Sequence, residues 1–211
     1  MRVVLENVSV IIAVEGPSAA GKTTWCHRHA SEVVEEYVPT GAEPDGTDMS
    51  AQAAYWTHVN SRRWAQAVAL EARTGLAICD SDPLKLHYSW CLSRIGAAPW
   101  ARFRHELAAV RQAFLAGALG LADLALVSIP PLEVLRAQRL ADPTRPRRSF
   151  ELHARLGDHL HAWYQAVDAV EPGRVLWQLP DDGPPSRTPP PRSDRSDVAL
   201  LDALVTSLPS R

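Results

Sequence analysis

Apolar and polar residues are arranged along the chain in blocks whose spacing predicts strands alternating with helices. Short apolar runs rich in β-branched residues have the length of buried strands, and longer segments between them repeat apolar residues every three or four positions, as amphipathic helices do. The predicted strands are 8–15, 32–37, 75–79, 124–129 and 175–179. The predicted helices are 22–29, 50–73, 83–95, one from about 99, 132–140, one after Ser149, and 198–208.

This order predicts a parallel sheet with helices on both faces. In such sheets, ligands bind at the carboxyl ends of the strands. Gly16, Glu36 and Asp80 each come directly after a predicted strand. We therefore expect these three residues to meet at one edge of the sheet.

By composition, the chain divides into one domain and a tail. Residues 1–180 hold all the predicted strands and are enough for one α/β domain with a sizeable core. Residues 181–197 are rich in proline, serine, arginine and aspartate, so we expect a disordered linker there. Residues 198–211 are expected to form a short C-terminal helix.

The segment after the first predicted strand fits the phosphate-loop pattern G-x-x-x-x-G-K-[ST] at every fixed position. Its glycines let backbone N–H groups turn toward phosphate oxygens, and the helix that follows adds its positive dipole end. Lys22 is expected to reach the outer phosphates and Thr23 to ligate Mg²⁺. The alternative is a glycine turn that only caps a helix, but the strand before it favours nucleotide binding. The predicted nucleotide-binding residues are Gly16, Pro17, Ser18, Ala19, Ala20, Gly21, Lys22, Thr23 and Thr24.

Carboxylates at two strand ends are candidates for metal binding and proton transfer. Asp80 ends a predicted buried strand near the loop, so we expect it to hold the metal directly or indirectly, whereas Asp82 before a proline suits a helix cap. Glu35 and Glu36 end the second predicted strand, where a carboxylate can accept a proton from an acceptor hydroxyl. We prefer Glu36, although so short a strand leaves the facing of the pair open.

An arginine-rich stretch follows the strand 124–129. Arg136 and Arg139 are three residues apart and share a helix face. A lid that closes over phosphates has this composition, and the alternative is a solvated basic face. The predicted lid covers about 136–150 and includes Arg136, Arg139, Arg145, Arg147 and Arg148.

Three further side chains are candidates for contact with a substrate. Arg63 lies on the same helical stripe as Trp56, where it is either salt-bridged at the edge of the core or directed at the substrate. Most aromatic residues are expected in the core. Trp56 and Tyr88 are candidates for stacking on a planar substrate.

Composition narrows the class of protein. The net charge of −2 gives no electrostatic case for nucleic-acid binding, and no apolar stretch is long enough to cross a bilayer. The three cysteines lack C-x-x-C spacing and indicate reduced thiols, and the histidines lack the spacing of a zinc site. We expect a cytoplasmic protein without a signal peptide and without nucleic-acid or membrane partners, and a homodimer is left open.

With these residues placed, the chain resembles the nucleoside and nucleotide kinase group of phosphate-loop proteins, especially its deoxynucleoside-kinase-like and thymidylate-kinase-like branches. Residues 12–24 look like the opening strand and loop, 33–37 like the strand end that carries an acidic base, and 129–163 like the lid region. The family's third-strand acid is followed by an arginine, which the stretch Asp80-Ser81-Asp82 lacks. The resemblance implies a phosphate-loop three-layer sandwich with a five-stranded parallel sheet of order 2-3-1-4-5.

Motifs and resemblance together predict a kinase that uses ATP and Mg²⁺ and transfers the γ-phosphate to a hydroxyl or phosphate of a nucleoside, nucleotide or related metabolite. The missing arginine makes an antibiotic or another non-nucleoside alcohol a second candidate acceptor. A third reading is a nucleotide-dependent regulatory protein whose tail contacts a partner. A GTPase is disfavoured because no N-K-x-D stretch is present, while ATP and GTP remain open as donors.

Overall fold

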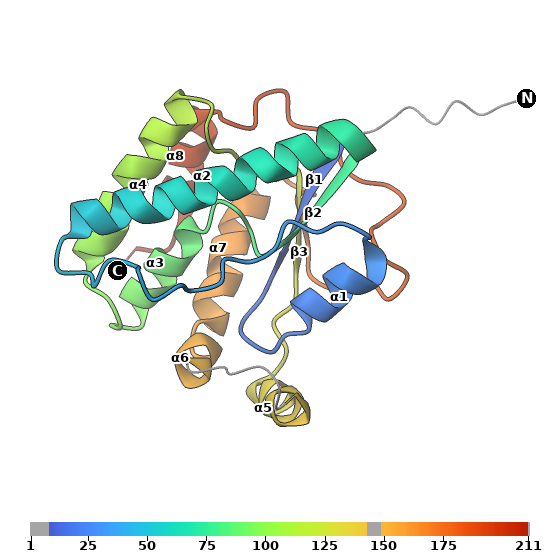
Figure 1. Cartoon of the computed structure of the whole chain (residues 1–211), viewed down its shortest axis with the longest axis horizontal. Coiled ribbons are helices and arrows are strands. Elements are labelled where there is room, and N and C mark those ends of the chain that lie inside the picture. Colours follow the sequence, from blue (N-terminus) through green and yellow to red (C-terminus); the bar gives the residue numbers. More distant parts are fainter. Residues whose placement is uncertain (1–8, 143–148, 211) are drawn as a thin grey trace, which may run out of the picture.

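A computed structural model describes residues 9–142 and 149–210, and a parallel four-stranded sheet runs through its centre (Figure 1). The strand order is β2-β1-β3-β4. Ile12 in the central strand lies opposite Ile78 on one side and Leu124 on the other. The strands are β1 (Val10–Glu15), β2 (Leu76–Asp80), β3 (Leu124–Val127) and β4 (Val175–Leu176).

Helices connect these strands and cover both faces of the sheet, as expected for an α/β fold. None of the described helices combines the length and apolarity that crossing a bilayer requires. The helices are α1 (Lys22–His29), α2 (Met49–Thr74), α3 (Leu86–Arg94), α4 (Trp100–Leu115), α5 (Leu132–Ala141), α6 (Phe150–Ala154), α7 (Gly157–Val170) and α8 (Val198–Ser207).

The five-stranded order expected from the sequence is wrong at the second strand. Residues 32–37 make only one bridge, in which Val34 donates its N–H to Ile78 O and accepts from the N–H of Asp80, both at 2.9 Å. The physical reason is that only two apolar residues are available there, and the exposed Glu35 and Glu36 follow them directly. A single bridge at the edge beside β2 therefore takes the place of the predicted strand.

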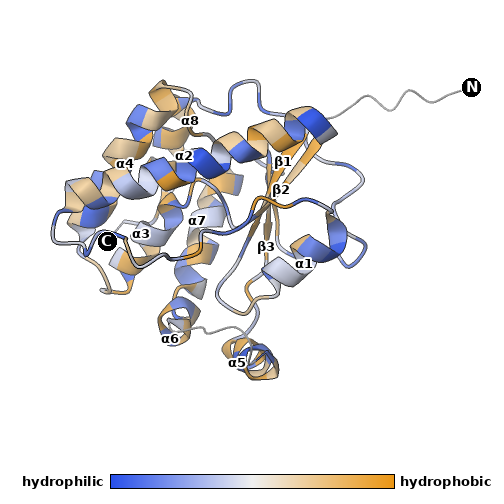
Figure 2. Cartoon of the chain, in the orientation of Figure 1, coloured by the Kyte–Doolittle hydropathy of each residue, from blue (hydrophilic) through white to orange (hydrophobic). Residues whose placement is uncertain are grey.

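The sheet is buried because β1 presents apolar residues to both faces, and the strands are the most continuously apolar elements in Figure 2. Val10, Ile12 and Val14 pack with Trp25 of α1 on one face. Ile11 belongs to the larger cluster on the other face, where α2, α3, α4, α7 and α8 contribute. This alternation is the strand period of two. It places the smaller cluster, with α1, on one face of the sheet and the larger cluster on the other.

The proline-rich segment 181–197 is held against the domain, which corrects the expectation of a disordered linker. Arg195 forms ion pairs with Glu71 and Asp123, and its Nε lies 3.1 Å from Asp123 Oδ1. Arg192 is buried and donates to Ala122 O at 2.7 Å. Composition suggested a solvated chain, but these buried acids and carbonyls bind the arginines of the segment. The helix expected after it is present as α8.

Two predicted helix starts are shifted. Asp48, not Ser50, caps α2, because its side chain accepts from the N–H groups of Ser50 and Ala51. α3 begins at Leu86 instead of Pro83. Asp82 nevertheless has the local structural role expected of it, since its Oδ1 accepts from Leu84 N at 2.9 Å.

Candidate active site

The phosphate loop, residues 16–24, leaves β1 in a conformation that only small residues allow. A Cβ atom on Gly16 would lie 2.2 Å from the backbone oxygen of Ser128, so a larger residue would collide with β3 and the chain after it. Gly21 has a left-handed φ of 83° directly before α1, and Ala19 has a φ of 69°. The glycines are therefore required by close approach and by backbone conformation.

Most N–H groups of this loop are open. Two of them are used internally: Gly16 N donates to Glu15 Oε1 at 2.9 Å and Ala20 N to Pro17 O at 3.2 Å. Successive open amides beside a helix N-terminus are the groups that bind phosphate oxygens. Within residues 9–142 and 149–210, the N–H groups of Ser18, Ala19, Gly21, Lys22 and Thr23 donate to no acceptor.

Thr23 and Asp80 meet across the start of α1 and the end of β2. Thr23 Oγ1 donates to Asp80 Oδ2 at 2.5 Å. Asp80 Oδ1 is buried and has no hydrogen-bond partner in the described part of the protein. Burial raises the pKa of Asp80, and the nearby Glu36 carboxylate acts in the same direction.

These two oxygens fit a magnesium ion bound together with a nucleotide. Mg²⁺ usually takes one or two protein oxygens and completes its shell with phosphates and water. The hydroxyl of Thr23 and the unpartnered oxygen of Asp80 supply such a set. A larger set of protein ligands is not needed for such an ion. Among the described residues, no group of three or more His, Cys, Asp or Glu side chains is placed to hold a metal ion.

Lys22 lies over the same loop. Its Nζ donates to the backbone oxygens of Gly16 at 2.7 Å and Pro17 at 3.2 Å. The ammonium group is therefore at the mouth of the loop, where the sequence pattern predicted it.

Glu36 lies in the segment after the single bridge, within electrostatic range of Lys22 and Lys85. Its carboxylate accepts from Lys85 Nζ at 3.1 Å, and the side chain is 47% exposed. Partial burial acts to raise the pKa of Glu36, but attraction to Lys85 and Lys22 prevails and the pKa is lowered. Glu36 is thus an ionised acid next to the phosphate loop. Glu35 instead turns to His27, at 3.4 Å.

Arg63 is held by the backbone of neighbouring segments. It is buried on α2 and donates to four backbone oxygens, and no carboxylate of residues 9–142 or 149–210 forms an ion pair with it. The four oxygens belong to Glu35, Asp80, Ser81 and Asp82, at 2.9, 2.8, 2.8 and 3.4 Å. Arg63 therefore joins the segment that holds Glu36 to the end of β2. Its hydrogen bonds add to the single bridge that links these two segments.

Two residues that sequence reasoning did not single out lie at the centre of this site. Glu15, at the end of β1, is buried and accepts from Gly16 N and, at 3.2 Å, from Asp82 N. Its Oε2 also lies 3.5 Å from Lys85 Nζ and 3.3 Å from His87 Nε2. Burial opposes the charge of Glu15, but Lys85 and His87 lower its pKa well below the usual range.

The described residues of the predicted lid, 136–142 and 149–150, belong mainly to α5 and to the start of α6, and these two helices lie at the carboxyl end of the sheet (Figure 1). Leu135 of α5 and Phe150 of α6 form an apolar cluster with Ala20 of the phosphate loop, against which Ala19 also packs. The sequence showed no sign of this contact. Arg145, Arg147 and Arg148 of the predicted lid lie outside the described residues.

Arg136 and Arg139 are paired with a carboxylate on α6. Their guanidinium groups lie 3.4 and 3.3 Å from Glu151, and Arg139 also lies over the ring of Phe150 at 4.7 Å. Both side chains are about half exposed. The two arginines therefore share a face, as their spacing predicted, and that face is engaged with Glu151 beside the loop.

The two aromatic candidates occupy different places. The Tyr88 hydroxyl lies 3.1 Å from His153 Nε2, which links α3 to α6 near the site. Trp56 packs edge-on against Tyr37 and Tyr55, with ring centroids 5.3 and 5.2 Å away. Tyr88 is thus close to the charges of the site, while Trp56 belongs to an aromatic cluster on α2.

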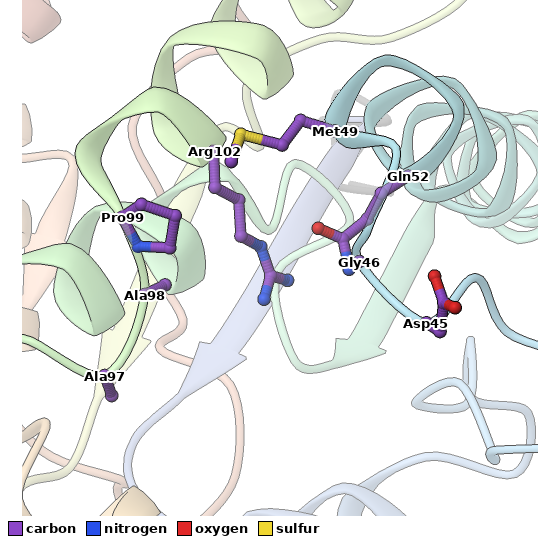
Figure 3. Close-up of a pocket in the computed structure, with 8 residues that line it drawn as sticks. All are labelled: Asp45, Gly46, Met49, Gln52, Ala97, Ala98, Pro99 and Arg102. Carbon is purple, nitrogen blue, oxygen red and sulfur yellow. The ribbon is translucent and has the colours of Figure 1, made fainter.

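A cavity of about 170 Å³ lies between the amino ends of α2 and α4 (Figure 3). Gln52 and Arg102 extend into it from the two helices, and Asp45 lies at its edge. The buried carboxylate of Glu106 accepts from Arg102 Nε at 2.9 Å. The charges of Lys85 and Arg102 both act on the Tyr88 phenol, whose pKa burial raises. Tyr88 is therefore within electrostatic range of Arg102 at the cavity and of Lys85 and Glu36 at the site.

Together, the parallel sheet, the open loop and the residues at the strand ends define an α/β phosphate-loop fold with polar and charged side chains gathered at one end of the sheet. Lys22, Thr23, Asp80 and Glu36 come together there as the sequence predicted, whereas Arg63 lies behind the site and Trp56 beside it. Lys85 and Glu15 are the additions that the structure makes.

Solved structures of a deoxyadenosine kinase from M. mycoides share this fold. The structure with dCTP bound has a TM-score of 0.53 and 12% identity, and the match covers 94% of this chain and 100% of that chain. The structure with dATP bound gives 0.52 and 16%, over 80% and 89%. The structure with the products dCMP and dCDP gives 0.51 and 11%, over 93% and 95%.

These matches confirm the resemblance to deoxynucleoside-kinase-like phosphate-loop proteins at the level of the fold. At such low identity the likeness concerns the fold alone. No protein-family model and no curated protein matches the sequence.

Proposed function

We propose that this protein is an ATP- and Mg²⁺-dependent phosphotransferase that acts on a hydroxyl or phosphate of a nucleoside, nucleotide or related small metabolite. The observation that carries this proposal is that the required groups gather at the carboxyl end of the sheet. The open amides and Lys22 belong to the loop after β1, Thr23 bonds Asp80 at the end of β2, and the charge of Lys22 acts on the ionised Glu36. A phosphate cradle, a metal position and a proton acceptor are the parts that phosphoryl transfer needs.

On the donor side, the amides of the phosphate loop hold the polyphosphate and Lys22 contacts its outer part. Thr23 and Asp80 hold Mg²⁺, which neutralises charge that develops on the transferred group. Arg136 and Arg139 lie on the helix whose Leu135 packs against Ala20, so they are candidates to complete the cradle. For them to do so, their contacts with Glu151 must be exchanged for phosphate oxygens.

On the acceptor side, Glu36 receives the proton. The oxygen of an acceptor hydroxyl forms a bond to the γ-phosphorus while the bond to the bridging oxygen of ADP breaks, and the hydroxyl proton passes to the Glu36 carboxylate. A carboxylate with a lowered pKa is ionised and ready for this step at neutral pH. An acceptor phosphate would require no base, so the two acceptor classes differ in their dependence on Glu36.

The direct test is to incubate the protein with Mg²⁺ and γ-labelled ATP or GTP. Deoxyadenosine, other nucleosides, nucleoside monophosphates, and aminoglycoside- or phenicol-type alcohols serve as separate acceptors. We expect label in a compound of the nucleoside or nucleotide set. Label in an antibiotic would replace the acceptor while keeping the phosphotransferase. Slow release of labelled phosphate with every acceptor unlabelled would overturn the proposal in favour of a nucleotide-dependent regulatory protein.

A further inference from the structure

The chain uses arginine for nearly all its cationic side chains, and Lys22 and Lys85 are its only lysines. Lys22 belongs to the phosphate-loop motif. Lys85 is sixty-three positions later in the sequence, yet it also lies at the site, since its Nζ is 3.1 Å from Glu36. A lysine carries a compact charge on a flexible stem, whereas arginine offers a planar fork. Both positions that hold lysine are therefore at the carboxyl end of the sheet.

Lys85 is enclosed by acceptors from three different segments. Its Nζ contacts the Ser81 hydroxyl, Glu36 Oε1 and, at 3.5 Å, Glu15 Oε2. The side chain is three-quarters buried, and the Glu15 side chain is almost fully so. An ammonium group removed from water and shared between two carboxylates stabilises both of them in their charged form. Burial acts against the charge of Lys85, but the two glutamates raise its pKa.

The backbone around Lys85 adopts left-handed conformations, at Ser81 and at Lys85 itself. Only three non-glycine residues of the described chain have a positive φ, namely Ala19, Ser81 and Lys85, at 69°, 73° and 50°. Ala19 lies in the phosphate loop, and the other two lie in the turn that brings the lysine back to Ser81. Left-handed conformations at non-glycine residues cost free energy and collect where function requires them.

Resting on the proposed function, we infer that Lys85 is a positioning residue that holds the Glu36 carboxylate at the phosphate loop. The charged groups that act on Glu36 include Lys22 from α1, Lys85 from the turn before α3, Glu15 from β1 and Asp80 from β2. Lys85 itself is subject to Glu15, Glu36 and Arg63. Without its ammonium group, Glu36 would be repelled by the carboxylates of Glu15 and Asp80, and of these groups Lys22 alone would offset the repulsion.

The test compares Lys85→Met with Lys85→Arg and with Arg62→Met, a control that removes an exposed cation of α2. The first measurement follows the carboxyl ¹³C resonance of Glu36, assigned with Glu36→Gln, as a function of pH. We expect the pKa of Glu36 to rise by about one unit or more in Lys85→Met, to stay low in Lys85→Arg, and to be unchanged in Arg62→Met. This measurement needs neither nucleotide nor acceptor.

The second measurement is the pH profile of transfer to the acceptor that the labelling experiment identifies. In Lys85→Met we expect kcat at neutral pH to fall about 10- to 100-fold and the acidic limb of the profile to move to higher pH. The affinity for Mg²⁺·ATP, measured by calorimetry, should stay within about twofold, because Lys85 contacts none of the phosphate-loop residues 16–24 that would hold the donor. Lys85→Arg should recover most of the rate.

An unchanged Glu36 titration in Lys85→Met would overturn the inference, and so would a donor affinity that falls as much as the rate. If the methionine variant melts far below the wild type, Lys85→Gln replaces it, since an amide is a polar donor without the charge in the place where Lys85 bonds Ser81 and Glu36. If every acceptor stays unlabelled, the proposed function fails, whereas the carbon titration still decides the role of Lys85.

Discussion

The hydroxyl of Thr23 and the carboxylate of Asp80, 57 residues apart in the sequence, lie 2.5 Å from each other at the base of the phosphate loop. This contact joins the first turn of α1 to the end of β2. The other oxygen of Asp80 is buried without a partner among the described residues. A buried acceptor of this kind is costly unless a cation or donor satisfies it.

We therefore expect Asp80→Asn to weaken the use of the metal. The amide retains an oxygen for Thr23 but removes the charge, so the Mg²⁺ concentration for half-maximal transfer should rise at least about tenfold and kcat should fall about 100-fold. A titration of activity with Mg²⁺ measures both. Asp82→Asn is the matched control, since Asp82 bonds Leu84 N and the Tyr164 hydroxyl. An equal Mg²⁺ requirement in both variants would refute the assignment.

Lys22→Ala tests the donor side. Removing the ammonium group from the mouth of the loop should reduce transfer about 1,000-fold or more. The fold should persist, because Lys22 contacts only backbone oxygens of its own loop. Calorimetric binding of Mg²⁺·ATP and a melting curve distinguish the two effects. Arg28→Ala, on an exposed part of the same helix, should leave both unchanged, and a fully active Lys22→Ala would show that the triphosphate binds elsewhere.

A comparison of Glu36→Gln with Glu35→Gln tests which of the two glutamates accepts the proton. With a hydroxyl acceptor, loss of the proton acceptor should lower kcat about 100- to 1,000-fold at unchanged ATP affinity. Glu35→Gln should change kcat less than about threefold, because Glu35 pairs with the exposed His27. Single-turnover transfer from labelled ATP measures the chemical step. Equal rates in the two variants would place the base on another residue.

Glu15 should make stability depend on pH in the acid range. Burial disfavours its charge, yet Lys85 and His87 lower its pKa well below the usual range. A depressed pKa in the folded protein contributes stability above the unfolded value of about 4.3, and this contribution is lost as the pH falls through the folded value. Glu15→Gln should therefore cost about 3 kcal/mol at pH 7 and progressively less below about pH 4. Urea unfolding at several pH values measures this, and a pH-independent difference would contradict it.

The sequence was most informative where a function depends on neighbouring residues. The phosphate loop is a local pattern, so its place between β1 and α1 was predicted, and Asp80 followed from its position after a buried strand. The segment 32–37 was predicted as a strand because its two valines form a short apolar run. Two apolar residues are too few to sustain a ladder of strand pairing, and a single bridge forms there.

Other parts of the site depend on contacts between distant segments that no spacing encodes. Glu15, Lys85 and Ser81 meet only after the sheet is assembled. Arg63 was correctly placed on the inner stripe of its helix, but its four carbonyl partners follow from three-dimensional packing. The arginines of 181–197 suggested solvation because the acids that receive them, Glu71 and Asp123, lie far away in the chain.

Leu135 and Phe150 pack against the alanines of the phosphate loop, so the loop that we propose binds the nucleotide also supports α5 and α6. Any compound that changes the conformation of that loop should also change the packing of α5 and α6 against it. A fluorophore on the outer side of α5 would then report occupancy of the loop as a change in its own surroundings, and would provide a signal for screening donors before any acceptor is known.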